Sequence, residues 1–214
     1  MRIDLTFAGD YELAVPDSSD LSEMVAYHYP PGDVVDLATI AVVERTISYQ
    51  VAGMAPTDPV PIPSPDPVQL EVRPAAADRW LGIFDAQLMS PRGVNCAVAL
   101  PDRESIAVVS HGAAYRVWAA DPRRWDELSI GGVMGPVVVT APELVLLVEH
   151  TTILAYGPRG IAWKSEPPVS DDLEAVSVDG EHLRAKGYDA PRNKIVVFTV
   201  DLRTGRPQEA RLHD

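Results

Sequence analysis

The chain has almost no cysteine. Cys96 is the only one in 214 residues, so no intrachain disulfide can form and a zinc site built on a cysteine cluster is excluded. This usage fits a reducing compartment, and we expect a cytoplasmic protein. Cys96 lies in an apolar run, residues 94–100, with no histidine or cation beside it in sequence to lower its pKa. We therefore expect a buried and unreactive thiol.

Basic side chains are scarce as well. The chain has 18 Lys and Arg against 31 Asp and Glu, and its net charge is -13. That balance opposes binding to nucleic-acid phosphates and to anionic membranes, whereas a basic protein or a cationic ligand would be attracted. Long apolar runs are missing too, since no uncharged stretch reaches the roughly 18 residues of a membrane-spanning helix. The first ten residues also lack the apolar core of a secretory signal.

Known catalytic and nucleotide-binding motifs are absent. The sequence has no G-x-S-x-G or S-x-x-K nucleophile motif, and neither a Walker loop nor G-x-G-x-x-G. The glycine-rich residues 131–135 lack the lysine of a phosphate-binding loop. The acidic groups around Asp17 and Asp171 lack the ligand spacing of a calcium loop. We therefore predict no catalytic residues, no metal site and no cofactor, and we favour a non-enzymatic protein over an enzyme.

Short β-type segments are abundant. From Val94 onward, apolar and β-branched runs alternate with turn sequences that contain glycine, proline or aspartate. No long helical pattern separates these runs, which excludes an α/β fold with a parallel sheet and predicts an all-β antiparallel meander. A two-sheet β-sandwich is the alternative. We also expect few short helices, over residues 20–25 and 121–127, where capping signals precede apolar residues.

Prolines divide the chain. Six of them fall within residues 56–67, which excludes a helix or a central strand and predicts a stiff surface connector, with a docking ligand as the alternative. Before it, residues 1–55 should form an N-terminal β region, with a hairpin over 2–15 and a long strand over 37–51. After it, residues 68–214 should form the meander. We expect one compact domain overall.

Three segments of the meander resemble one another. They are residues 106–118, 145–156 and 175–185, with offsets of about 39 and 30 residues. The second continues through a Gly157–Gly160 turn to Trp163. This order of strand, small turn, strand ending in an aromatic residue, glycine turn and tryptophan resembles a β-propeller blade of the quinoprotein-like kind, over residues 94–210. Three units cannot close a ring of blades, so we predict open or incomplete blade-like sheets.

Four residues are candidates for ligand binding. His111, His150 and His182 recur at matching places in the three segments, so similar stacking could gather their imidazoles into a metal-binding or acid–base cluster. The alternative is that each histidine is a turn residue at a strand end. Trp125 lies among charged residues and is the candidate for an exposed contact.

Three functional hypotheses remain. We favour a non-enzymatic binding or protein-interaction module of unknown specificity, for which the charge suggests a basic protein partner. The second hypothesis is a metal-binding protein or an enzyme that uses the histidine cluster. The third is a homo-oligomeric structural protein that pairs its sheet edges.

Overall fold

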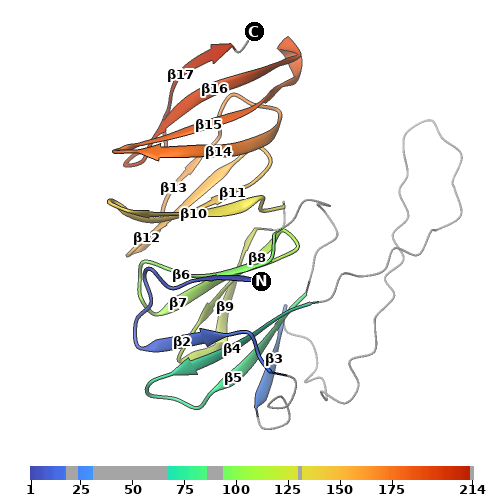
Figure 1. The fold of residues 1–214 in the computed structure, drawn as a ribbon, viewed down its shortest axis with the longest axis vertical. Coiled ribbons are helices and arrows are strands. Elements are labelled where there is room, and N and C mark those ends of the chain that lie inside the picture. Colours follow the sequence, from blue (N-terminus) through green and yellow to red (C-terminus); the bar gives the residue numbers. More distant parts are fainter. Residues whose placement is uncertain (18–23, 31–66, 86–93, 130–131, 213–214) are drawn as a thin grey trace, which may run out of the picture.

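The chain folds into a stack of open β-sheets. The computed structural model describes residues 1–17, 24–30, 67–85, 94–129 and 132–212. In these residues, seventeen strands form four sheets that lie one above another along the long axis of the molecule (Figure 1). Within these ranges the only helical element is the 3-10 turn Ala190–Arg192, and none of the four sheets closes into a barrel. The prediction of an all-β fold with open, mostly antiparallel sheets is confirmed.

We number the sheets from one end of the stack and give the strands of each in spatial order. Sheet 1 contains β2 (Tyr11–Ala14), β4 (Val68–Pro74), β5 (Trp80–Phe84) and β3 (Val25–Tyr29). Sheet 2 contains β1 (Arg2–Asp4), β6 (Cys96–Ala99), β7 (Ser105–Ser110), β8 (Ala113–Trp118) and β9 (Asp121–Ser129). Sheet 3 contains β10 (Gly135–Thr140), β11 (Glu143–Val148), β12 (Ile153–Gly157) and β13 (Gly160–Ser165). Sheet 4 contains β14 (Asp171–Asp179), β15 (His182–Asp189), β16 (Lys194–Asp201) and β17 (Pro207–Leu212).

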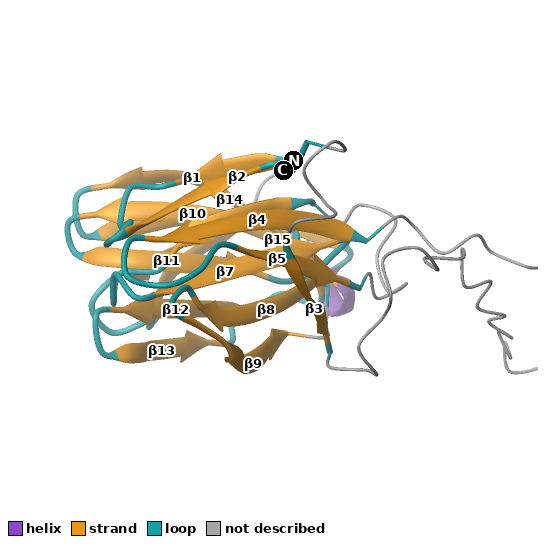
Figure 2. Ribbon diagram, turned by 90° about the horizontal axis from the view of Figure 1, so that it is seen from below, coloured by secondary structure: helices purple, strands orange, loops and turns teal. Residues whose placement is uncertain are grey.

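The first strands of the four sheets lie along one side of the stack. Seen along the stack, β1, β2, β10 and β14 gather at one border, and β3, β9 and β13 gather at the opposite one (Figure 2). We call the border formed by β1, β2, β10 and β14 the first-strand edge. The four sheets therefore all have their first strand on the same side of the molecule.

A regular repeat underlies the stack. In sheets 1 to 4, the strands β4, β7, β11 and β15 begin at Val68, Ser105, Glu143 and His182, which gives repeats of 37, 38 and 39 residues. The first predicted segment matches β7 and β8, and the second matches the equivalent strands β11 and β12. The third, residues 175–185, spans β14 and β15 and is therefore displaced by one strand. Because first and second strands both alternate with period 2, the pattern alone could not fix the position of a strand in its sheet.

The predicted hairpin over residues 2–15 is wrong. β1 pairs in parallel with β6 in sheet 2, whereas β2 pairs antiparallel with β4 in sheet 1. Gly9 lies where the chain crosses between the sheets, and a Cβ there would collide with the carbonyl oxygen of Arg103. The glycine that suggested a hairpin turn instead permits the close passage of two backbone segments.

The predicted helix over residues 121–127 is wrong as well. These residues belong to β9, which pairs with β8 and places Trp125 opposite Val117. The early proline is tolerated because β9 is an edge strand. The predicted strand over 37–51 and residues 56–66 of the connector lie outside the described residues. So do most residues of the helix predicted over 20–25, where the described chain resumes at Met24 and β3 begins at Val25.

Tryptophans join neighbouring sheets. The Nε1–H of Trp80 in sheet 1 donates to the carbonyl of Ala119 in sheet 2 over 2.8 Å, and that of Trp163 in sheet 3 donates to Leu202 in sheet 4 over 2.7 Å. Each pair is 39 residues apart in sequence, which is about one repeat. Two apolar cores fill the spaces between the sheets, one from sheet 1 to sheet 3 and one between sheets 3 and 4. The stack is therefore a packed scaffold that fixes the position of its edges.

Candidate functional site

The structure separates the three candidate histidines. His111 lies in the turn between β7 and β8 of sheet 2, and His150 lies between β11 and β12 of sheet 3. His182 begins β15, whereas the residue that His150 contacts, Asp171, lies opposite Tyr188 near the other end of that strand. At about 3.3 Å per residue, His182 is roughly 20 Å from Tyr188 along β15. His150 and His182 therefore cannot ligate one metal ion.

The histidines contact structural partners. His111 lies in a two-residue hairpin turn with Gly112, where both residues have positive φ (47° and 93°), and its Nε2 lies 3.1 Å from Asn95 Nδ2. Histidine is one of the residues that tolerate this left-handed region. The Nδ1 atom of His150 lies 3.1 Å from Asp171 Oδ1 and links sheet 3 to sheet 4. Among the described residues, no three His, Cys, Asp or Glu side chains could hold a metal ion together.

Trp125 packs inward. Its ring is partly buried against the first core, with centroids 6.1 Å from Tyr29 and 6.4 Å from Tyr115. Because side chains alternate along a strand, the neighbouring Arg124 and Asp126 are directed to the other face of β9. The charged context that made Trp125 a candidate for an exposed contact thus belongs to the opposite face.

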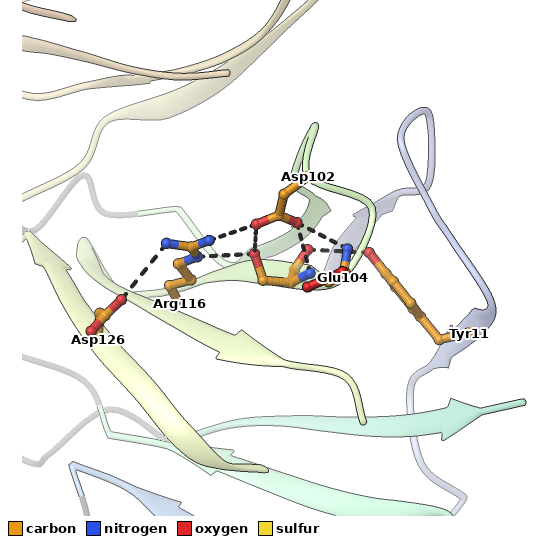
Figure 3. Close-up of polar contacts among 6 residues, drawn as sticks. Tyr11, Asp102, Glu104, Arg116 and Asp126 are labelled. Atoms are coloured by element: carbon orange, nitrogen blue, oxygen red, sulfur yellow. Dashed lines mark hydrogen bonds and ion pairs between the residues drawn. The ribbon is translucent and has the colours of Figure 1, made fainter. Parts of the chain in front are cut away.

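A polar network centres on Asp102 in sheet 2 (Figure 3). Its carboxylate accepts hydrogen bonds from the Ser105 hydroxyl and Arg116 Nη2, both at 2.6 Å, and from the backbone N–H groups of Glu104 and Ser105, both at 2.9 Å. Arg116 Nε also donates to Ser105 Oγ at 2.9 Å. Burial alone would raise the pKa of Asp102, but these hydrogen bonds outweigh it and hold the pKa below its usual value.

This network connects sheets. The Tyr11 hydroxyl in sheet 1 donates to the Ser105 carbonyl at 3.2 Å, and the Arg116 guanidinium lies 6.0 Å from the ring centroid of Tyr156 in sheet 3. Arg116 and Arg124 also lie over the ring of Trp118, at 4.1 and 3.8 Å. The groups are turned toward one another and Ser105 is fully buried, so the network stabilises the stack. Sequence analysis missed it, although Asp102 followed by Ser105 fits a turn closed by an aspartate side chain.

A groove opens between sheets 3 and 4. The edge strands β10 and β14 line it together with residues of β11, β15 and β16. Its volume is about 620 Å³. Its apolar lining includes Val137 and Val148 from sheet 3, and Leu173, Ala175 and Ile195 from sheet 4. Its polar lining includes Glu174 and Lys186, whose side chains form an ion pair of 3.0 Å.

The shape of the groove depends on irregularities in β14. The register between β14 and β15 shifts twice, between Asp171 and Glu174 and between Ala175 and Ser177, and Asp172 has a φ of 51°. Such bulges bend a strand and redirect its side chains. The N–H of Leu173 is bound to the carbonyl of His150 at 3.0 Å. A period-2 pattern shows no such bulges, so the sequence could not reveal the groove.

The groove has the chemistry of a binding surface. Its lining contains no cysteine, serine or histidine side chain. Apolar walls with few polar groups are typical of sites that hold a ligand by contact. A smaller hollow of about 410 Å³ between sheets 1 and 2 is lined by His111, Asn95 and Val68, among others.

Comparisons with known proteins assign no family. A scan against protein-family models found no match, and a search of curated proteins found none either. One similar solved structure is the extracellular domain of a one-component system from B. thetaiotaomicron, at 12% identity and a TM-score of 0.37. The match covers 68% of this chain and 22% of that one, so this chain spans about a fifth of its length. No helix in the described part of the chain is long and apolar enough to cross a membrane.

Proposed function

We propose that the protein is a non-enzymatic protein-interaction module whose binding surface is the groove between β10 and β14. The observation that carries this proposal is the apolar groove between two strands, each of which has a sheet neighbour on one side only among the described residues. Exposed apolar surface beside free backbone groups is a common basis of peptide recognition.

We rank the alternative, a metal-binding protein or an enzyme, below this proposal. It depended on convergence of His111, His150 and His182, and His182 lies at the far end of its sheet from the residue that His150 contacts. We retain the interpretation of the sheets as blade-like units of an incomplete propeller. The nearly constant repeat of 37 to 39 residues supports it.

The experiment compares one substitution at two exposed positions. Ile195 lines the groove and is 43% exposed, whereas Ile161 on β13 is 62% exposed and does not line it. Wild-type, Ile195→Arg and Ile161→Arg proteins would each serve as bait in the source cells, with quantitative mass spectrometry of co-purifying proteins. We expect a partner that wild type and Ile161→Arg retain and Ile195→Arg loses. A set of co-purifying proteins that is the same for all three baits would refute the proposal.

A further inference from the structure

We infer that the partner of the groove is an extended, positively charged segment that adds to the free edge of β14 as a further strand. The inference rests on the proposed function and specifies the chemistry of the partner. β14 forms hydrogen bonds with β15 on one side, and no described strand lies on its other side. A free strand edge exposes unpaired N–H and C=O groups, which an extended peptide can bind.

β14 is the longest strand of the first-strand edge. It has nine residues, against three in β1, four in β2 and six in β10. Most of its residues are exposed, including Val176 at 48% and Val178 at 40%. The N–H groups of Asp172 and Leu173 are already bound, to Asp171 Oδ1 and to the carbonyl of His150. An added strand would therefore pair with the part of β14 that follows Leu173, where it would cover the two exposed valines.

A comparison with β9 shows that β14 is less protected. β9 also has nine residues and lies at a sheet edge, but it carries Pro122, which lacks an N–H, and charges of both signs. β14 contains no proline. Its charged residues are all acidic: Asp171, Asp172, Glu174 and Asp179.

The single sign of charge selects the occupant. Two copies of β14 paired edge to edge would bring carboxylates together, which disfavours a second copy of this chain. Asp171 and Glu174 already contact His150 and Lys186. The acidic charge of the strand and the net charge of -13 would still attract lysine and arginine side chains and accelerate the encounter. Acidic residues on β14 thus protect the edge from self-association and favour a basic strand.

The groove indicates the pattern of the partner. A strand added to β14 would lie about 4.8 Å from it, and its side chains would alternate between two faces. One face would meet Val137 and Ala175, the half-buried apolar residues of the lining. The other would lie beside the carboxylates of β14. The geometry therefore favours a segment in which apolar residues alternate with Lys or Arg.

Three synthetic ten-residue peptides test this inference on the full chain. One alternates Val and Lys, the second alternates Val and Glu, and the third is the Val-Lys peptide with every other backbone nitrogen methylated. We expect the Val-Lys peptide to bind at least about tenfold more tightly than the other two, because the second reverses the charge and the third lacks main-chain donors. Its affinity should fall as salt rises. Amide shifts in NMR spectra should concentrate in β14.

Charge-matched variants show whether β14 itself is responsible. Asp172→Asn with Asp179→Asn removes two carboxylates from β14, and Glu12→Gln with Glu104→Gln removes two exposed carboxylates from sheets 1 and 2. We expect the first pair to weaken binding of the Val-Lys peptide about tenfold and the second to have little effect. Equal effects of the two pairs would overturn the assignment to β14.

The outcomes separate this inference from the proposed function. If Ile195→Arg loses its cellular partner but the Val-Glu or N-methylated peptide binds as well as the Val-Lys peptide, the groove remains a binding surface and strand addition by a basic segment is overturned. If no peptide binds and Ile195→Arg loses no partner, both fail. A dimer joined through β14, detected by light scattering and abolished by Val178→Arg, would show that the occupant is a second copy and would overturn the inference.

Discussion

Two buried serines differ in what their hydroxyl groups contact. Ser105 is fully buried, and its Oγ donates to Asp102 and accepts from Arg116. Ser165 is 2% exposed, and its Oγ has no hydrogen-bond partner among the described residues. Ser105→Ala leaves charged partners without a hydrogen bond and should lower the free energy of unfolding by about 1–3 kcal/mol. Ser165→Ala should leave it unchanged or raise it. Urea denaturation measures both, and equal losses would contradict this account.

Asp102 should make the free energy of unfolding depend on pH in the acid range. Its pKa is lowered in the folded protein, so the unfolded chain binds the proton more tightly. The stabilisation is therefore present above the unfolded pKa, about 4, and is lost as pH falls through the folded pKa. We expect wild type to lose stability between about pH 5 and pH 2, and Asp102→Asn to be less stable at neutral pH but less sensitive to acid. The free energy of unfolding, measured with urea across this range, would change with pH in parallel for wild type and Asp102→Asn if Asp102 had no such role.

Cys96 should be inert while the protein is folded. Burial raises the pKa of its thiol to about 11, although the positive charge of Arg2 acts to lower that pKa. At pH 8 the thiolate, which is the reactive form, is therefore rare. A chromogenic disulfide reagent should react slowly with the native protein and rapidly after unfolding in urea. Rapid reaction in the native state would show that the thiol is accessible.

Residue-level prediction succeeded where the local sequence determined the environment. The apolar run around Cys96 predicted a buried thiol, and the alternative of a turn residue holds for His111. It failed for Trp125 because charged neighbours in a strand lie on the opposite face, and for Asp102 because Arg116 comes from another strand.

Among the elements, the strands after Val94 were predictable because each has an apolar run between turn residues. The apolar run that opens the predicted segment 106–118, for example, is part of β7 (Ser105–Ser110). The pairing of strands was less predictable, since β1 and β2 are neighbours in sequence but belong to different sheets. The bulges of β14 that shape the groove arise from tertiary packing, which a period-2 pattern does not encode.

Two glycines test the contact between sheets 3 and 4. Gly205 has a φ of 70°, and a Cβ there would lie 2.6 Å from the ring of Trp163, whereas Gly180 has a φ of 54° and open space around it. Gly180→Ala should cost about 1–2 kcal/mol for the left-handed backbone. Gly205→Ala should cost a further 1–3 kcal/mol, roughly, for overpacking. Thermal or urea unfolding of the two variants measures the difference, and equal costs would show that the Trp163 ring adjusts freely.

At the scale of the whole molecule, sheet 3 couples the two cores. In β11, Val145 and Leu147 belong to the core toward sheet 2, and Leu144, Leu146 and Val148 to the core toward sheet 4. Burial on both faces explains the continuous apolar run of this strand. We expect a single cooperative unfolding transition, with coincident curves from circular dichroism and tryptophan fluorescence. Two separated transitions would show that sheet 4 unfolds independently.

The repeat of 37 to 39 residues gives the molecule an adjustable length. Each sheet packs against its neighbours in the stack (Figure 1), so duplication of one repeat adds a layer of about 10 Å without altering the others. Because the groove lies between two successive sheets and depends on the bulges of β14, duplication of the repeat that contains β14 would add a second groove, which under the proposed function is a second docking position in line with the first. The number of layers would then set the valency of the protein, and a tandem partner could bind with avidity.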